Sequence, residues 1–348
     1  MSTVASVPVS ALTVGIDVGG TSIRACVVDD TGEVLDSVQA PTPQSAKALE
    51  DALDRTVREL AGRHPVSAVG LAVAGFITPD LTTVRFAPHL PWKNVPVAND
   101  LSERLGLPVV LEHDANAAAW AEHRFGAAAG GRNVVMVAIG TGIGAALLID
   151  GTLYRGSHGV APELGHLQVV PGGRPCACGK RGCWERYCSG TALVDTAIEL
   201  LAADPTSSTI LAREVASDPG SLTGRRIASA ARDGDPLAIR TMEEFARWLG
   251  VGLAMVGDVY DPDLVVIAGG VSGSAPLFLD HARDVYASLA TGSGHRPLAR
   301  IRETQLGESA QRIGAATLAR LSAPVGGFSG GGGRKHPRPR GEGGAGPE

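Results

Sequence analysis

The sequence predicts an α/β protein in which two similar lobes, each built on a βββαβα core, face a common cleft. Its 348 residues are enough for about two domains with sizeable cores. Hydrophobic residues make up 44% of the chain and charged residues 19%, which is typical of a soluble globular protein. The segments VGIDVGGTSIRACVVDDTG and VAIGTGIGAALLIDG share a layout of strand, glycine corner, strand and turn. This weak echo predicts that one half of the fold duplicates the other.

The first half of the chain predicts three strands, a helix, a strand, a short helix, a further strand and a second long helix. Apolar runs that end in glycine or turn residues predict the strands, and apolar residues at helical spacing predict the helices. The expected bounds are 12–18, 23–28, 33–38, 47–63, 66–74, 99–105 and 109–113, followed by a helix from Asp114. The first three strands are expected to form an antiparallel meander.

The second half repeats the opening of the first half and then becomes mainly helical. A strand, a glycine corner and two further strands are expected, followed by a long helix, a buried strand and a closing helix. The expected bounds are 134–139, 145–149 and 152–155 for the three strands, 236–256 for the long helix, 264–268 for the buried strand and 310–321 for the closing helix.

These elements predict two lobes with irregular ends. The smaller lobe is expected over residues 12–118 and is completed by a closing helix at 310–322. The larger lobe is expected over residues 119–309. Residues 1–11 are expected to be a flexible arm. The Gly/Pro-rich residues 323–348 are expected to be disordered, because they cannot bury enough apolar surface to offset their ordering entropy.

Charge and targeting signals limit the partners of the protein. With 31 Lys and Arg against 36 Asp and Glu, the formal net charge is −5, so the chain lacks the cationic excess that binds nucleic-acid phosphates. The first residues have neither a basic segment nor a long apolar segment, and no apolar run is long enough to span a bilayer. We therefore expect a cytoplasmic protein with no nucleic-acid or membrane partner.

Glycine corners follow three predicted strands. The first, DVGGT, lies between two strands, so it is neither a P-loop nor a dinucleotide fingerprint, both of which need a following helix. Backbone N–H groups of such a corner can approach a phosphate closely, and a strand-end carboxylate can hold Mg²⁺ directly or through water. One corner alone is compatible with an ordinary tight turn, but three favour an ATP site. The candidate residues are Asp17, Gly19, Gly20, Thr21, Arg24, Gly140, Thr141, Gly142, Gly269 and Gly270.

The segment EHDANAAA places Asp114 where a strand meets a helix. An isolated Asp at such a position commonly caps the helix N-terminus. A strand end that faces a cleft is also a suitable place for a general base, because phosphoryl transfer to a sugar hydroxyl needs a carboxylate within hydrogen-bond reach of that hydroxyl. Asp114 is therefore the candidate base. Asn116 is expected to be structural, with orientation of Asp114 or the substrate as the alternative.

Four of the five cysteines lie in the short segment PCACGKRGCWERYC. Cys176, Cys178 and Cys183 have the spacing C-x-C-x4-C, and His166 lies ten residues before the first of them. This is the Cys₃His set of a closed structural zinc site, with Cys188 as the competing fourth ligand. Disulfides or an iron–sulfur cluster are alternatives that the spacing disfavours. A closed site activates no water, so the zinc is expected to order the loop at 163–188.

Two carboxylates bracket this metal segment. Glu163 and Glu185 flank the expected ligands, and carboxylates accept hydrogen bonds from vicinal hydroxyls, as sugar recognition requires. Each residue by itself is more often a surface charge. Because they bracket the zinc loop together, we expect them to accept sugar hydroxyls on a rigid, metal-braced wall.

Together, DVGGTSIR, EHDANAAAWAE, GTGIGAALLIDG, PELGH and CACGKRGCWE resemble the ROK family of sugar kinases and repressors, in particular its bacterial glucokinases. The resemblance covers about Leu12 to Leu321. It implies a hexokinase/actin-like (ribonuclease H-like) fold of two α/β lobes. It also implies phosphorylation of glucose to glucose 6-phosphate by ATP and Mg²⁺, a structural Zn²⁺ and a homodimer or homotetramer.

The resemblance also assigns site residues. It implies that Asp114 is the general base for the 6-hydroxyl and that Glu163 and Glu185 bind the sugar. It implies that His166 both binds zinc and touches the sugar, and that the backbone at Gly75 meets the sugar. The implied zinc ligands are His166, Cys176, Cys178 and Cys183.

Two positions depart from the family pattern and leave the substrate open. His113 precedes the base where a sugar-binding Asn is typical, and Arg24 stands where Lys is common. The alternatives are a kinase for N-acetylmannosamine, N-acetylglucosamine, mannose or fructose, a polyphosphate-using glucokinase, and a noncatalytic sugar sensor. A DNA-binding repressor is not expected, because only about a dozen residues precede the first strand, too few for a helix-turn-helix.

Overall fold

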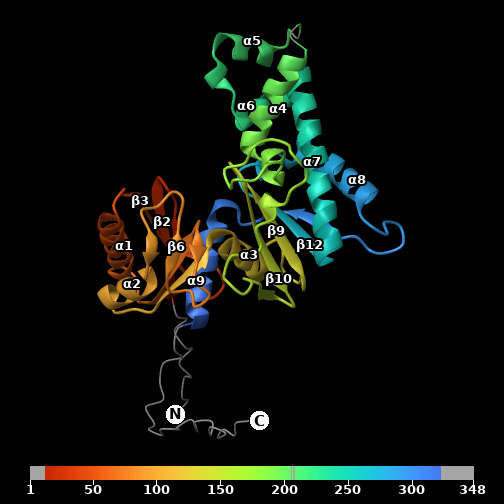
Figure 1. Cartoon of the computed structure of the whole chain (residues 1–348). Coiled ribbons are helices and arrows are strands. Elements are labelled where there is room, and N and C mark those ends of the chain that lie inside the picture. Colours follow the sequence, from red (N-terminus) through yellow and green to blue (C-terminus); the bar gives the residue numbers. More distant parts are fainter. Residues whose placement is uncertain (1–11, 205, 207, 323–348) are drawn as a thin grey trace, which may run out of the picture.

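Two five-stranded sheets of the same topology organise the fold (Figure 1). The structure is a computed structural model that describes residues 12–322 except 205 and 207, so the expectations for 1–11 and 323–348 lie outside the described residues. The first sheet consists of β1 (Leu12–Val18), β2 (Ser22–Val28), β3 (Val34–Pro41), β4 (Val66–Val73) and β8 (Val109–His113). The second consists of β9 (Val134–Ile139), β10 (Ile143–Ile149), β11 (Thr152–Leu153), β12 (Leu264–Ala268) and β13 (Arg300–Glu303).

The strand order confirms the predicted duplication. The first sheet runs β3-β2-β1-β4-β8, and the second runs β11-β10-β9-β12-β13. In both sheets the first three strands form an antiparallel meander, and the last two are parallel to the strand that begins the meander. The expected α/β fold with two related halves is therefore correct, although the sequence echo is weak.

Some short strands were not predicted. A small sheet of order β5-β6-β7 is formed by β5 (Phe76–Ile77), β6 (Val84–Phe86) and β7 (Lys93–Val95), around the Pro-rich stretch. The edge strand β13 was also missed. Strands of two to four residues are too short to show a periodic apolar pattern, so tertiary pairing determines them.

The helices that cover the first sheet lie on its two opposite faces. They are α1 (Ala46–Ala61) and α2 (Val97–Leu105) on one face, with α9 (Ala310–Ser322) on the other and α3 (Asp114–Phe125) against α9. Helix α1 begins where the Ser45 hydroxyl accepts the Ala48 N–H, and it buries a stripe at helical spacing. The sheet side chains Val14 and Ile16 pack into the core that α1 and α2 cover. The intervening residue, Gly15, faces α9.

Helix α9 approaches its neighbours at backbone distance because three glycines line the contact. A Cβ at Gly15 would lie 1.8 Å from the Arg312 carbonyl oxygen, and one at Gly70 would lie 1.9 Å from the Ala315 carbonyl oxygen. A Cβ at Gly314, on the helix itself, would lie 1.7 Å from the Ala117 carbonyl oxygen of α3. No side chain fits at these positions without a shift of the backbone.

A buried carboxylate ties the end of α3 to the segment before α9. Glu122 is fully buried and accepts the N–H of Ala127, 2.7 Å away, and the N–H of Leu306, 2.8 Å away. It also accepts the N–H of Gln305 and the hydroxyl of Thr304. Because its acceptor capacity is satisfied, this carboxylate fixes the connection between the second sheet and α9.

The second sheet carries a helical extension (Figure 1). Its helices are α4 (Gly190–Ala203), α5 (Ile210–Ser217), α6 (Gly224–Arg232), α7 (Pro236–Tyr260) and α8 (Leu279–Leu289). The long helix α7 begins where Asp235 caps two N–H groups, and it packs against α4, α6 and α8. The sequence predicted α7 but not the other four. Within the described ranges, no helix is both long and apolar enough to cross a membrane.

We predict that Gly70→Ala destabilises the fold. The added methyl group would meet the backbone of α9, so the free energy of unfolding should fall by about 1–3 kcal/mol. Urea unfolding followed by circular dichroism measures this change. The matched control is Gly273→Ala, because a Cβ there meets no atom within 4 Å. Equal stability of the two variants would contradict the close approach of α9.

Candidate functional site

A cavity of about 700 Å³ lies between the two lobes and collects most of the predicted nucleotide residues. Asp17 and Arg24 reach it from the first sheet, and Asp114 reaches it from the start of α3. The second sheet contributes the corners after β9 and β12. The predicted residues that line it are Asp17, Arg24, Asp114, Gly140, Thr141, Gly142, Gly269 and Gly270. The cavity thus joins Asp17 and Arg24 of the first sheet to two glycine corners of the second sheet.

The remaining residues of the first corner lie beside this cavity. Gly20 and Thr21 line an adjoining cavity of about 600 Å³, and His89 lines both cavities. Gly19 lines neither of them. Its N–H donates to the Ser22 carbonyl at 3.0 Å, and its carbonyl accepts the Thr42 hydroxyl at 2.6 Å, so it closes the corner. His89 was not among the predicted residues.

The ionised form of Asp17 is disfavoured in the interlobe cavity. Burial, and to a lesser extent the negative charge of Asp114, raise the pKa of its carboxyl to about 6, against the opposing effect of Arg24 and Arg312. Two carboxylates that repel each other in a cleft are the hard oxygen donors that Mg²⁺ prefers. The donor set therefore fits the predicted ion.

Asp114 begins α3 but does not cap it. The N-cap residue is His113, and it makes no side-chain capping bond, so the interpretation of Asp114 as a helix cap is wrong. The Asp114 Oδ1 atom accepts the Ala115 N–H at 2.8 Å and lies 3.4 Å from Nδ1 of His113. The Oδ2 atom has no hydrogen-bond partner among the described residues. One carboxylate oxygen is therefore held in place, and the other is open to a ligand.

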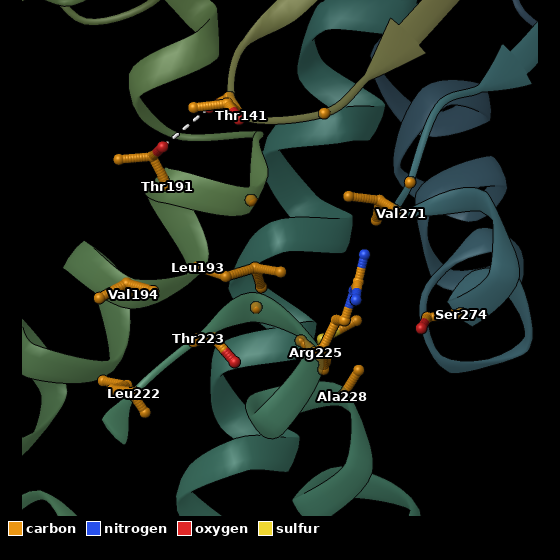
Figure 2. Close-up of a pocket in the computed structure, with 15 residues that line it drawn as sticks. Thr141, Thr191, Leu193, Val194, Leu222, Thr223, Arg225, Ala228, Val271 and Ser274 are labelled. Carbon is orange, nitrogen blue, oxygen red and sulfur yellow. Dashed lines mark hydrogen bonds between the residues drawn. The ribbon is translucent and has the colours of Figure 1, made fainter. Parts of the chain in front are cut away.

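A second cavity, of about 770 Å³, continues from the first and was not predicted (Figure 2). The two cavities share Gly140, Thr141 and Gly270. Helices α4, α6 and α7 form its other walls, and the Thr191 hydroxyl fixes the corner by donating to the Thr141 carbonyl at 2.9 Å. The additional lining residues include Leu193, Val194, Leu222, Thr223, Gly224, Arg225, Ala228, Met242, Val271 and Ser274. They come from separate helices and form no motif in the sequence.

A small cavity brings together three of the predicted sugar residues. Gly75, His113 and Glu163 line it, together with Asn116. Burial raises the pKa of the Glu163 carboxyl, while the charges of His113 and His166 lower it. Glu185 and Asp114 also act electrostatically on Glu163. The predicted sugar residues are thus close neighbours at one edge of the interlobe cleft.

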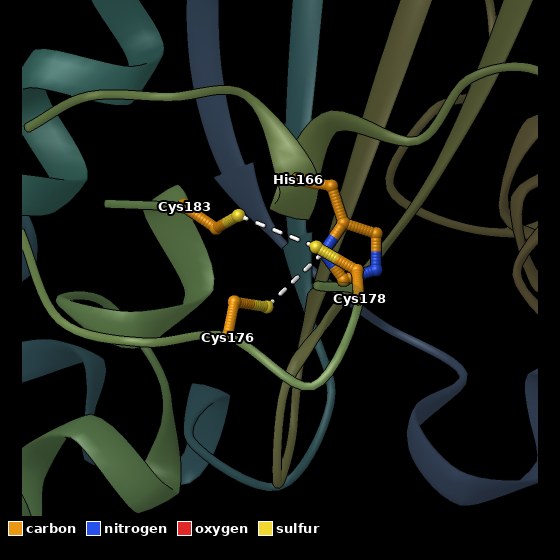
Figure 3. Close-up of side chains that lie close together, drawn as sticks. All are labelled: His166, Cys176, Cys178 and Cys183. Atoms are coloured by element: carbon orange, nitrogen blue, oxygen red, sulfur yellow. Dashed lines mark hydrogen bonds between the residues drawn. The ribbon is translucent and has the colours of Figure 1, made fainter. Parts of the chain in front are cut away.

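The predicted zinc ligands converge on one point (Figure 3). The ligand atoms of His166, Cys176, Cys178 and Cys183 all lie within 4.8 Å of one another. The Sγ atoms of Cys178 and Cys183 are 3.6 Å apart, and Cys176 Sγ is 3.7 Å from His166 Nδ1. Ligands of a tetrahedral zinc with bonds of about 2.3 Å are separated by about 3.8 Å. The four groups therefore fit Zn²⁺.

The thiols of this cluster differ in pKa. Burial raises the pKa of the thiols of Cys176 and Cys183, whereas hydrogen bonds from the Lys180 backbone and the neighbouring thiols lower the pKa of the Cys178 thiol. Zinc binding deprotonates such thiols and releases the protons. The ion would then order a loop that has few apolar residues of its own.

Trp184 anchors the metal loop in the core of the second lobe. The side chain is fully buried, and its Nε1–H donates to the Trp248 carbonyl at 2.8 Å. A Cβ at Gly252 of α7 would lie 1.9 Å from the indole, so this glycine makes room for the ring. Cys188 is also fully buried in this core and lies outside the ligand cluster. The choice of His166 over Cys188 as the fourth ligand is thereby supported.

Glu185 lies between the metal loop and a glycine corner. Its Oε1 accepts the Cys176 thiol at 3.0 Å and lies 3.5 Å from His166 Nδ1. Its Oε2 lies 3.4 Å from the Ile143 nitrogen, and a Cβ at Gly142 would approach that oxygen to 2.5 Å. The side chain therefore connects the metal cluster to the nucleotide corner, and its contact with sugar remains a prediction.

The paired sheets and the carboxylate-lined cleft between them define the class of two-lobed hexokinase- and actin-like proteins. A profile of the ROK family matches residues 13–321. A glucokinase of Streptomyces coelicolor is 42% identical over 314 residues, which cover 90% of this chain and 99% of that protein. The chain belongs to the ROK family, as its motifs predicted.

Two further comparisons show the range of this family. A crystal structure of a ROK family glucokinase from Streptomyces griseus, in complex with glucose and AMPPNP, is 42% identical with a TM-score of 0.78. The match covers 89% of this chain and 100% of that one. The xylose repressor of Bacillus subtilis is 29% identical over 315 residues, which cover 88% of this chain and 76% of the repressor.

We predict that Cys178→Ser lowers the zinc content of the purified protein from about one ion per chain, because a hydroxyl is a poor substitute for a thiolate ligand. Elemental analysis after dialysis measures the content. Cys188→Ala is the control, and it should keep its zinc because its sulfur lies outside the cluster. Zinc loss in the control alone would reverse the ligand assignment.

We predict that Asp17→Asn stabilises the protein without added Mg²⁺ at neutral pH. The folded-state pKa of Asp17 is about 6, above its unfolded value, so ionisation costs stability as the pH rises from about 4 to about 6. The neutral amide avoids this cost, and the free energy of unfolding at pH 7.5 should rise by about 1–3 kcal/mol. Urea unfolding at pH 7.5 and at pH 4 measures the effect. An increment of the same size at pH 4 would contradict the electrostatic cause.

Proposed function

We propose that this protein is a glucokinase, which transfers the γ-phosphoryl group of ATP to the 6-hydroxyl of glucose. One observation carries the proposal. Asp114 lines the same interlobe cavity as Asp17 and the glycine corners of the second sheet, and its neighbour in sequence, His113, lines the small cavity. A base, a place for phosphates and a place for a sugar thus adjoin one another. The similarity to the two Streptomyces glucokinases supports glucose as the acceptor.

Asp114 acts as the general base in this proposal. The Ala115 N–H holds Oδ1 in place, so Oδ2 is free to accept the proton of the 6-hydroxyl as that oxygen attacks phosphorus. The transfer itself needs mainly alignment and charge stabilisation. Asp114 therefore supplies both proton acceptance and orientation of the attacking oxygen.

The nucleotide occupies the two large cavities. The adenosine lies among α4, α6 and α7, where the lining is largely apolar with Arg225 at its edge. The phosphates follow the shared residues Gly140, Thr141 and Gly270 toward Asp17. Asp17 would hold Mg²⁺ directly or through water, and the ion would neutralise charge on the phosphates. Gly20, Thr21 and Arg24 would add donors to the terminal phosphate.

The sugar lies in the small cavity and against the metal loop. Glu163 and Glu185 accept its hydroxyls, and His166 contacts it through the ring nitrogen that does not face the cysteines. His113 and the backbone at Gly75 complete the wall. The Cys₃His cluster would hold Zn²⁺, which keeps these groups in position and takes no part in the transfer.

We also infer that the protein works in the cytoplasm as a homodimer or homotetramer. Its resemblance to the ROK family supports the assembly, and its thiol-rich cluster is typical of a reducing compartment. A noncatalytic sugar sensor is the alternative function. Oδ2 of Asp114 is free to accept a proton, which favours a catalytic kinase over a noncatalytic sugar sensor.

A panel of sugars and phosphoryl donors tests the proposed function. Coupled-assay rates with glucose, mannose, fructose and the N-acetylated hexosamines, each with ATP–Mg²⁺ or polyphosphate, should give the highest kcat/KM for glucose with ATP. Turnover only with an amino sugar would replace the substrate. Binding without turnover for every sugar would favour the sensor.

We predict that Asp114→Asn lowers kcat by about 10²–10⁴-fold, because the amide keeps the shape of the carboxylate but cannot accept the proton. The dissociation constant for glucose, measured by calorimetry without nucleotide, should change little. Asp150→Asn is the control, since the exposed Asp150 side chain pairs with Arg132 and lines neither the nucleotide cavities nor the small cavity. An equal loss of sugar binding and of rate would make Asp114 a sugar ligand.

A further inference from the structure

A buried ion pair joins Arg155 of the second lobe to Glu112, the residue that precedes His113 of the small cavity. Glu112, the residue before His113 on β8, is 2% exposed. Its Oε2 accepts both Nε, at 2.9 Å, and Nη2, at 2.5 Å, of Arg155, which follows β11 in the other sheet. Two guanidinium N–H groups thus converge on one carboxylate oxygen, and both hydrogen bonds are charge-assisted. The carboxylate is therefore held across the two lobes.

The second oxygen of Glu112 accepts hydrogen bonds from two residues that line the small cavity. Oε1 accepts the backbone N–H of His113 at 3.0 Å and the side-chain Nδ2 of Asn116 at 2.9 Å. A carboxylate that already binds a guanidinium accepts hydrogen bonds, so the amide must present its NH₂ group to Glu112. The orientation of the Asn116 amide is thus fixed by its surroundings.

This orientation leaves a buried acceptor without a partner on a residue that lines the small cavity. Asn116 is 4% exposed and lines the small cavity with Gly75, His113 and Glu163. Its Oδ1 atom has no hydrogen-bond partner within the described part of the chain. Nδ2 is taken up by Glu112, which does not line the cavity, so Oδ1 is the atom of this amide that is left for a ligand. A buried polar atom without a partner is costly unless a ligand satisfies it.

The acceptor character of the cavity indicates the chemistry of that ligand. Glu163 and Asn116 Oδ1 both accept hydrogen bonds, and they lie on the same small cavity. A neighbouring pair of acceptors matches the O–H donors of a polyol. Asp114, the proposed base, lines the larger cavity instead, so Asn116 is suited to a hydroxyl that does not react.

We propose that Asn116 is a sugar-binding residue whose Oδ1 accepts a hydrogen bond from a nonreacting hexose hydroxyl, and that Glu112 and Arg155 are the positioning residues that set this orientation. The proposal rests on the function proposed above and adds a specificity-determining contact to it. It replaces the expectation that Asn116 is only structural.

A substrate–mutant cycle tests the contact directly. Calorimetry on the zinc-loaded full chain, without nucleotide, gives the dissociation constants of glucose and of its 1-, 2-, 3- and 4-deoxy analogues. One analogue should bind the wild type about tenfold more weakly than glucose, while Asn116→Ala binds that analogue and glucose equally. The proposal is overturned if each analogue shows the same loss in both proteins, because removal of the amide then affects no particular hydroxyl.

Arg155→Lys provides a second route that leaves Asn116 intact. An ammonium cannot form the two-pronged contact, so the selectivity against the same deoxy analogue should fall, while the melting temperature serves as a check on folding. Arg226→Lys is the matched control, because Arg226 also donates through Nε and Nη2 to one carboxylate, that of Glu214, at 2.7 and 2.6 Å, and does not line the small cavity. Unchanged selectivity in Arg155→Lys would overturn the positioning role.

The two proposals fail in different ways. If the wild type prefers another hexose, the proposed substrate is wrong, and the cycle is run with the deoxy analogues of the preferred sugar. If glucose is phosphorylated but no analogue shows coupling to Asn116, the inference alone is wrong. Binding of no hexose by the wild type would overturn both.

Discussion

The packing of α9, with its backbone directly against the first sheet and against α3, is the constraint on which the rest of the structure depends. Gly15, Gly70 and Gly314 permit this approach, and larger residues would force the elements apart. Helix α3 carries Asp114 at its start, and Glu122 near its end holds the segment that leads into α9. The position of the proposed base is therefore set by a close-packed junction between the lobes.

The cleft concentrates charge at a cost to stability. Asp17 and Asp114 repel each other, and burial disfavours the ionised form of Asp17. Elsewhere the protein satisfies its buried carboxylates: Glu122 accepts several backbone N–H groups, and Glu112 accepts a guanidinium. The contrast separates carboxylates that hold the fold together from Asp17 and Asp114, which we propose bind a cation and a substrate.

The sequence predicts features that depend on local pattern. The glycine corner at Gly19, the strand-to-helix junction at Asp114 and the cysteine spacing before Trp184 all appear where expected, because each is encoded within a few residues. The cavity wall formed by Arg225 and Met242 could not be predicted, since it joins separate helices without a motif. The orientation of the Asn116 amide likewise depends on contacts with Glu112, which in turn depend on a residue from the other lobe.

The burial of Trp184 has a consequence for the metal loop. The indole follows a metal-ligand cysteine by one residue, yet it packs in the same core as α7 and donates to a carbonyl of that helix. Metal binding and the stability of the second lobe are therefore coupled, because a change in the cluster shifts the neighbouring Trp184 ring in the core. The protein consequently carries a native fluorophore whose emission would report, from inside the core, on the state of a cluster near the surface.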